Sequence, residues 1–170
     1  MFSAQKIIVM FFAILLLIAC SEASEPQSVA KPNVININKI QLNVYKNPSC
    51  GCCKKWIQHI NEYGFQSDIH NQVALSQFKQ EKGIQPHYRS CHTAVSEKGY
   101  IFEGHIPAKY IAQFLQERPR NALGLAVPAM PVGTPGMEVG DKFMPYHVLL
   151  LKKDGSSEVY AVVNSYKEQF

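Results

Sequence analysis

The sequence predicts an α/β protein with a mixed sheet flanked by helices, followed by a Met/Pro/Gly-rich loop and a closing C-terminal hairpin. Segments with apolar residues at every second position alternate with segments that repeat every three or four positions, which indicates strands and helices in turn. Glycine and proline separate most of these segments. The part from Ile40 to Phe170 holds about 130 residues, the size of one ordinary domain.

Residues 1–19 are predicted to be a lipoprotein signal peptide. Lys6 supplies a positive charge, and the apolar run that follows it is too short for a transmembrane helix. The run ends in the letters LIAC, which resemble the lipobox of bacterial lipoproteins, so we expect lipidation of Cys20. A plain secretory signal is the alternative. Both interpretations predict the cell envelope, and the lipobox predicts the periplasm of a Gram-negative bacterium, with the lipid in the outer membrane.

Residues 20–39 are predicted to form a flexible tether, because Ser, Glu, Pro, Gln and Asn dominate and few apolar residues could be buried. The net charge of +4 is spread along the chain and is not gathered into basic blocks. Nucleic acid is therefore not expected as a partner, and the membrane is expected only through the lipid.

The first strand is predicted over residues 41–45, and the turn at 46–49 ends it. A helix follows, and Gly64 is expected to end it. Its apolar residues have the spacing of one helix face: Cys53, Trp56, Ile57, Ile60 and Tyr63. Residues 65–69 are predicted to form the second strand.

A second helix is predicted over residues 73–82, ending before Gly83. Its inner side is predicted to carry three apolar residues, Val73, Leu75 and Phe78. A hairpin follows, with strands at 93–95 and 100–102 and a tight turn at 96–99.

Pro107 is expected to begin the third helix, whose buried face is predicted to hold Ile111, Phe114 and Leu115. Residues 124–140 are rich in Gly and Pro and are predicted to form an irregular loop. A closing hairpin is predicted over 146–151 and 158–164, either extending the sheet or covering that loop.

The residues with the clearest chemistry lie between the first strand and the first helix. Cys50, Cys52 and Cys53 stand where free backbone N–H groups and the helix dipole stabilise thiolates. Cys50 and Cys53 alone have the C-x-x-C spacing of a redox motif. One structural disulfide explains three neighbouring thiols poorly, and a bound cation would remove the repulsion among the thiolates. The pattern therefore favours metal binding.

The chain resembles the CopG-like family of periplasmic copper-resistance proteins, long catalogued as a domain of unknown function. Four segments carry the resemblance: YKNPSCGCCK (45–54), SCHTA (90–94), EGHIPA (103–108) and GLAVPAMPVGTPGME (124–138). The resemblance implies that residues 40–170 form a thioredoxin-like metal-binding domain. It also implies that copper binds to the C-x-C-C cysteines and Cys91. It allows a copper-linked redox activity but does not settle the reaction.

In thioredoxin-like folds the loop before the hairpin faces the active-site cysteines, so we expect Cys91 to face the first three sulfurs. Its alternative role is that of a small buried residue. We expect Met130 and Met137 to be soft ligands that select Cu(I), although methionines also fill irregular cores. His105 is a candidate ligand or supporting residue, or a cap for the third helix. His92 is a better candidate than the two remaining hairpin-side histidines, His87 and His147.

The leading function is copper resistance or homeostasis by a protein that binds Cu(I), as a thiolate-bridged cluster if one ion cannot use all the sulfurs. Copper ions and other periplasmic copper-handling proteins are the expected partners. The alternative is a thiol-disulfide or copper oxidoreductase, with Cys50 and Cys53 as catalytic residues, so whether the protein is an enzyme stays open. A zinc-stabilised structural module ranks below both, because it would leave the methionines without a role.

Overall fold

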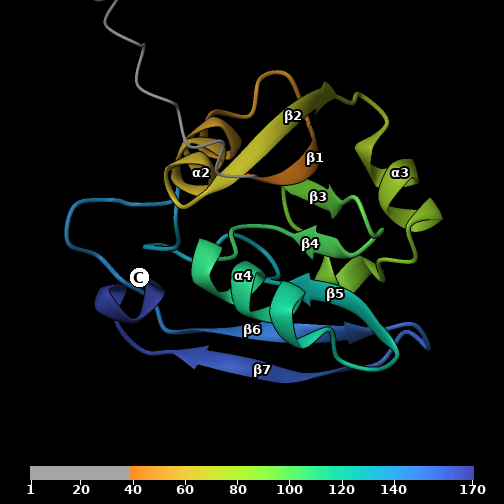
Figure 1. Cartoon of the computed structure of the whole chain (residues 1–170). Helices are drawn as coiled ribbons and strands as arrows, with labels where there is room; N and C mark the ends of the chain where they lie inside the picture. Colours follow the sequence, from red (N-terminus) through yellow and green to blue (C-terminus); the bar gives the residue numbers. More distant parts are fainter. Residues whose placement is uncertain (1–38) are drawn as a thin grey trace, which may run out of the picture. The chain divides into compact units, whose positions relative to one another are not determined.

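The computed structural model describes residues 39–170 (Figure 1). The predicted signal peptide, Cys20 and the predicted tether up to residue 38 lie outside the described residues. Among residues 39–170, no helix is both long enough and apolar enough to cross a membrane.

Within the described part the chain forms seven strands, three α-helices and two short 3₁₀ helices. In chain order the elements are β1 (Ile40–Lys46), α2 (Gly51–Glu62), β2 (Phe65–Asn71), α3 (Leu75–Glu81), η1 (Pro86–Tyr88), β3 (His92–Ser96), β4 (Ile101–Glu103), α4 (Ala108–Glu117), β5 (Ala122–Ala126), β6 (Tyr146–Lys152), β7 (Ser157–Val163) and η2 (Tyr166–Gln169).

The strands form one mixed sheet in the order β2-β1-β3-β4-β5-β6-β7. The pairs β1/β2 and β4/β5 are parallel, and the other pairs are antiparallel. In Figure 1, α2 lies beside β1 and β2, while α4 crosses in front of the strands from β4 to β6. The predicted mixed sheet with flanking helices is confirmed.

Most of the predicted elements lie where their sequence patterns place them. The stripe on α2 is buried at Cys53, Trp56 and Ile60, and the helix is followed by Gly64 at φ +90°, where glycine carries no Cβ penalty. The prediction for Val73 is wrong. It precedes α3 and is 86% exposed, because the helix begins only at Leu75 and its buried apolar contact is made by Phe78.

The prediction that 124–140 is entirely irregular is also wrong at its start. Residues 122–126 form β5, which pairs with β4 on one side and β6 on the other. Leu125 and Ala126 are fully buried, so sheet pairing and burial decide the conformation despite the neighbouring Gly and Pro residues. The irregular segment runs instead from Val127 toward β6. The hairpin of β6 and β7 extends the sheet.

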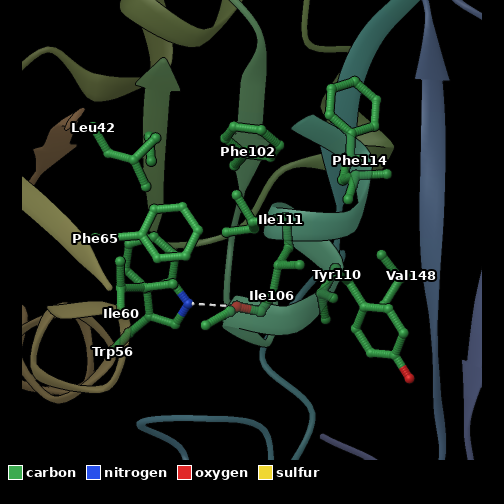
Figure 2. Close-up of a cluster of buried hydrophobic side chains, with 14 of the residues drawn as sticks. Leu42, Trp56, Ile60, Phe65, Phe102, Ile106, Tyr110, Ile111, Phe114 and Val148 are labelled. Carbon is green, nitrogen blue, oxygen red and sulfur yellow. Dashed lines mark hydrogen bonds between the residues drawn. The ribbon is translucent and has the colours of Figure 1, made fainter. Parts of the chain in front are cut away.

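The core joins α2 to α4 through the segment before α4. Figure 2 shows the indole of Trp56 among the buried side chains, where its Nε1 donates to the Ile106 carbonyl oxygen at 2.9 Å. Phe114 of α4 packs edge-on against Phe102 of β4. Because Trp56 lies one turn beyond the C-x-C-C motif and Ile106 directly follows His105, this hydrogen bond ties the start of α2 to the histidine.

Candidate metal centre

The C-x-C-C cysteines occupy the N-terminus of α2. Cys50 is the N-cap residue, and its sulfur accepts a hydrogen bond from the Cys53 N–H at 3.3 Å. The turn before it is held by Lys46, a buried residue whose Nζ donates to the Asn47 carbonyl oxygen at 2.9 Å. Cys50 and Cys53 form a disulfide with a Cα–Cα distance of 5.4 Å. Cys52 has a free thiol.

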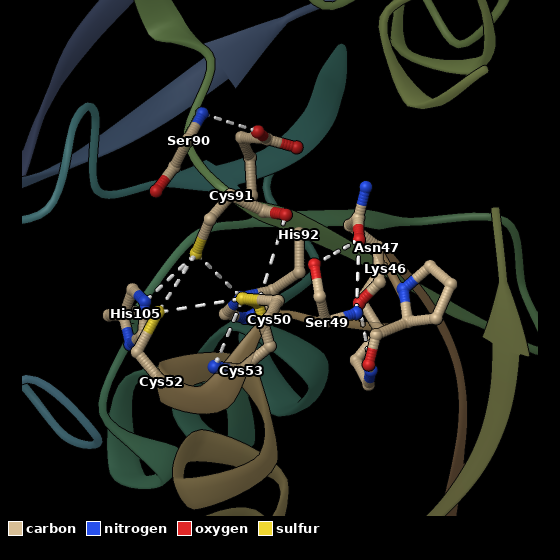
Figure 3. The surroundings of a disulfide bond; sticks show 12 residues. Lys46, Asn47, Ser49, Cys50, Cys52, Cys53, Ser90, Cys91, His92 and His105 are labelled. Atoms are coloured by element: carbon tan, nitrogen blue, oxygen red, sulfur yellow. Dashed lines mark hydrogen bonds between the residues drawn. A yellow bond between two sulfur atoms is a disulfide. The ribbon is translucent and has the colours of Figure 1, made fainter. Parts of the chain in front are cut away.

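The fourth sulfur comes from the segment before β3. Antiparallel pairing of β1 and β3 places Lys46 opposite His92, so the residue before β3 lies beside the turn that leads into α2. The Cys91 sulfur is 4.0 Å from the Cys52 sulfur, which is 3.5 Å from the Cys50 sulfur. The four sulfurs all lie within 4.8 Å of one another, and Figure 3 shows them converging.

His105 completes one side of this group. Its Nε2 lies 3.0 Å from the Cys91 sulfur, and its Nδ1 lies 2.8 Å from the Pro135 carbonyl oxygen. Since a carbonyl oxygen only accepts, Nδ1 carries the proton and the lone pair of neutral Nε2 faces the sulfur. Burial lowers the pKa of His105, which favours this neutral form.

His92 lies beside His105. Its Nδ1 is 3.3 Å from the Cys91 sulfur, and its ring packs against Trp56 at 4.2 Å between centroids. Burial, followed by the neighbouring His105, holds the pKa of His92 well below its ordinary value. Its Nε2 is buried without a hydrogen-bond partner among the described residues. The ligand atoms of Cys91, His92 and His105 lie within 4.8 Å of one another.

Burial, and then the neighbouring Cys52, raise the pKa of Cys91 to about 12. The thiol is therefore protonated at neutral pH when no cation is present. A metal ion that binds there must displace the proton, as metal ions do when they bind cysteine.

A buried ion pair that the sequence analysis did not find fixes the residue before Cys91. Lys79 of α3 and Glu103 of β4 pair with each other, with side chains 4% and 0% exposed. The Lys79 Nζ donates to the Ser90 carbonyl oxygen at 2.9 Å, and the Ser90 N–H donates to Glu103 Oε1 at 2.6 Å. Both backbone groups of Ser90 are thus bound. Nothing in the spacing of residues 79 and 103 signals this contact.

The predicted methionine ligands lie in the segment between β5 and β6. Met130 is 48% exposed and follows Ala129, whose carbonyl oxygen accepts a hydrogen bond from the Ser90 hydroxyl. Met137 is partly buried and follows Gly136. A Cβ on Gly136 would lie 2.7 Å from the Cys52 carbonyl oxygen, so the loop packs directly on the start of α2.

The remaining histidines lie apart from the sulfur group. His87 and His147 are exposed, in η1 and β6. His59 is partly buried, and its Nε2 accepts a hydrogen bond from the Ala108 N–H at 3.1 Å. It therefore caps the first turn of α4, a role that the sequence analysis had considered for His105.

Comparison with known proteins gives a family match and two similar solved structures. The family model described as "Protein of unknown function, DUF411" matches residues 88–137, which include Cys91, His92 and His105. Two solved structures, described as forms 2 and 1 of the copper resistance protein CopG, are each 37% identical to this chain, with TM-scores of 0.70 and 0.69. The matches cover 74% and 75% of this chain and 99% of each solved chain. Comparison with curated proteins gives no match.

Proposed function

The chain belongs to the CopG family of copper-resistance proteins, and from this premise we propose that it binds Cu(I) in the bacterial envelope and acts in copper resistance and homeostasis. The proposed ligands are the thiolates of Cys50, Cys52, Cys53 and Cys91. His105 and His92 supply the imidazole nitrogens, and Met130 and Met137 supply thioether sulfur from the loop.

The observation that carries the proposal is the 4.0 Å separation between the sulfurs of Cys52 and Cys91, which come from α2 and from the segment before β3. Two thiolates on one tetrahedral ion with metal–sulfur bonds of about 2.3 Å lie about 3.8 Å apart. The observed separation fits a shared ion with little movement. Thiolate, thioether and imidazole are donors that suit Cu(I).

The donor set is larger than one tetrahedral ion requires. Four sulfurs and two imidazoles converge, and each thiolate can bridge two ions. We therefore propose a thiolate-bridged group of Cu(I) ions. To use all four thiolates, the Cys50–Cys53 disulfide must first accept two electrons and two protons from a dithiol, and the resulting thiols must lose their protons to solvent as copper binds.

Elemental analysis of protein purified from the envelope without added metal tests this function. We expect copper well in excess of zinc. Zinc in excess of copper would contradict the proposal and favour the structural zinc module.

A second candidate function is that of a thiol-disulfide or copper oxidoreductase using the Cys50/Cys53 pair. The disulfide at the N-terminus of a helix favours it, since thiolates are stabilised there. Cys52 argues against it, because exchange needs one attacking and one resolving thiol and has little use for a third. Metal-free protein that reduces insulin with brisk turnover would support the enzyme. Absence of turnover would support the binding protein.

We also propose that the region from β1 to α4 is thioredoxin-like. Its strand order β2-β1-β3-β4, with a helix after β1, after β2 and after β4, supports this assignment. In such a fold Cys91 stands in the loop that faces the start of the first helix.

The proposed location is the periplasm, with the protein anchored to the outer membrane through lipid on Cys20. Other periplasmic copper-handling proteins are the proposed partners. Incorporation of labelled palmitate into the wild-type chain but not into Cys20→Ser would support the anchor. No labelling of either protein, or the same labelling of both, would contradict it.

A further inference from the structure

We propose that Lys79 and Glu103 are positioning residues that hold Cys91 within reach of Cys52. The proposal rests on the proposed copper-binding function, which gives the positioning its purpose. The proximity of Cys91 to Cys52 can nevertheless be tested without copper. It assigns a role to two residues outside the sulfur and imidazole group.

A closed ring of contacts surrounds the backbone of Ser90. Lys79 binds the carbonyl oxygen of Ser90, Glu103 binds its N–H, and the two side chains bind each other. Ser90 directly precedes Cys91 and lies outside β3, so the sheet does not satisfy these backbone groups. The side chains of Lys79 and Glu103 bind these backbone groups instead.

The buried ion pair has a cost in stability. Burying two charges is expensive, and an apolar pair of similar size is often at least as stable. An apolar pair, however, could not bind both backbone groups of Ser90. The need to fix this residue therefore explains why charges occupy these positions.

Further contacts hold Glu103 and Ser90 in place. The second oxygen of Glu103 accepts a hydrogen bond from the Thr93 hydroxyl at 2.6 Å, and the Ser90 hydroxyl donates to Ala129. A Cβ on Gly104 would lie 2.7 Å from Ser90 Cβ, so the backbone on that side leaves Ser90 no room to shift. The backbone directly before Cys91 is thus held in place. A binding site needs this, because its ligand atoms must be positioned to within about 1 Å.

Bridging of the two free thiols by dibromobimane tests the proposal. In this reaction each thiol sulfur replaces one bromide, so two carbon–sulfur bonds form while two protons and two bromide ions are released, and the bridged product is fluorescent. The full chain is used as Cys20→Ser, without reductant, so that the Cys50–Cys53 disulfide leaves only Cys52 and Cys91 as thiols.

We expect Glu103→Gln and Lys79→Met to bridge at least about tenfold more slowly than the parent while keeping its far-ultraviolet circular dichroism. The matched controls are Glu158→Gln and Lys152→Met, which break an exposed ion pair far from the cysteines in the sequence. These controls should bridge at the parental rate. Folded Glu103 and Lys79 variants that also bridge at the parental rate would overturn the proposal.

Thr93→Val decides the question if the charge variants do not fold, because it removes only one hydrogen bond to Glu103. A slower rate supports positioning, and an unchanged rate overturns it. Cu(I) binding is measured separately on each protein. Slow bridging in the variants together with no Cu(I) binding by the parent would leave the positioning role intact and reject the copper function.

Discussion

His105 presents an unprotonated Nε2 to the Cys91 sulfur at 3.0 Å, because its Nδ1 donates to the Pro135 carbonyl oxygen. A backbone carbonyl that fixes the tautomer of a ligating histidine is a common arrangement around protein-bound metals. The loop that contains Pro135 therefore contributes to the site through its backbone.

Replacement of His105 by Phe should weaken Cu(I) binding about tenfold or more, because it removes the nitrogen that faces Cys91. Anaerobic competition with bicinchoninate measures this affinity. His147→Phe is the control, since His147 is exposed on β6 and should leave the affinity unchanged. Equal affinities for the wild type and His105→Phe would exclude His105 from the site.

Combined replacement of Met130 and Met137 by Ala should lower Cu(I) affinity by about three- to tenfold, because two soft donors are lost beside the thiolates. Zinc affinity should change little. Met144→Ala is the matched control, since Met144 is exposed next to the start of β6. If the double variant and the Met144 variant bind Cu(I) equally well, the methionines are not ligands.

The stability of the metal-free protein should fall as the pH drops below 6.5. Burial lowers the pKa of His59, His92 and His105 in the folded state from the ordinary value of 6.5. The unfolded chain therefore binds more protons below that pH, so acid favours unfolding, and the loss continues until the folded-state pKa values are reached. Urea unfolding at pH 7.5 and pH 5.5 measures the effect. Equal or greater stability at pH 5.5 would show that the histidines are not buried in neutral form.

Gly104→Ala should destabilise the protein more than Gly99→Ala. Both glycines have φ near +80°, where an alanine costs about 1–2 kcal/mol. A Cβ on Gly99 meets open space, whereas one on Gly104 would lie 2.5 Å from the Val127 carbonyl oxygen. The crowding should add about 1–3 kcal/mol, which chemical denaturation of both variants measures. Similar losses for the two variants would mean that the backbone around Ser90 is free to move.

The elements with local signals were predictable from the sequence. The stripe on α2, the turn at residues 96–99 and the stop at Gly64 each follow from nearby residues. Strand β5 has no such signal, because its five residues include neither a β-branched nor an aromatic side chain. It is a strand because β4 and β6 pair with it on both sides, and pairing between distant segments is not visible in a short stretch of sequence.

Some residues of the candidate site could likewise be predicted from the sequence, and others could not. The C-x-C-C motif at the start of a helix could be recognised from its spacing, and family resemblance pointed to Cys91. The ion pair of Lys79 and Glu103 could not be foreseen, because lysine on an amphipathic helix is usually solvated and its partner lies on another element. Hydrogen bonds to Ser90 link the pair to the site, and only the three-dimensional arrangement reveals them.

The central claim is that Cys52 and Cys91 bind the same copper centre. The most direct test is an anaerobic Cu(I) titration of the reduced chain, in the Cys20→Ser background, with and without Cys91→Ser. The account predicts that Cys91→Ser lowers Cu(I) affinity at least about tenfold and reduces the number of ions bound per chain. Identical affinity and stoichiometry in the two proteins would contradict it.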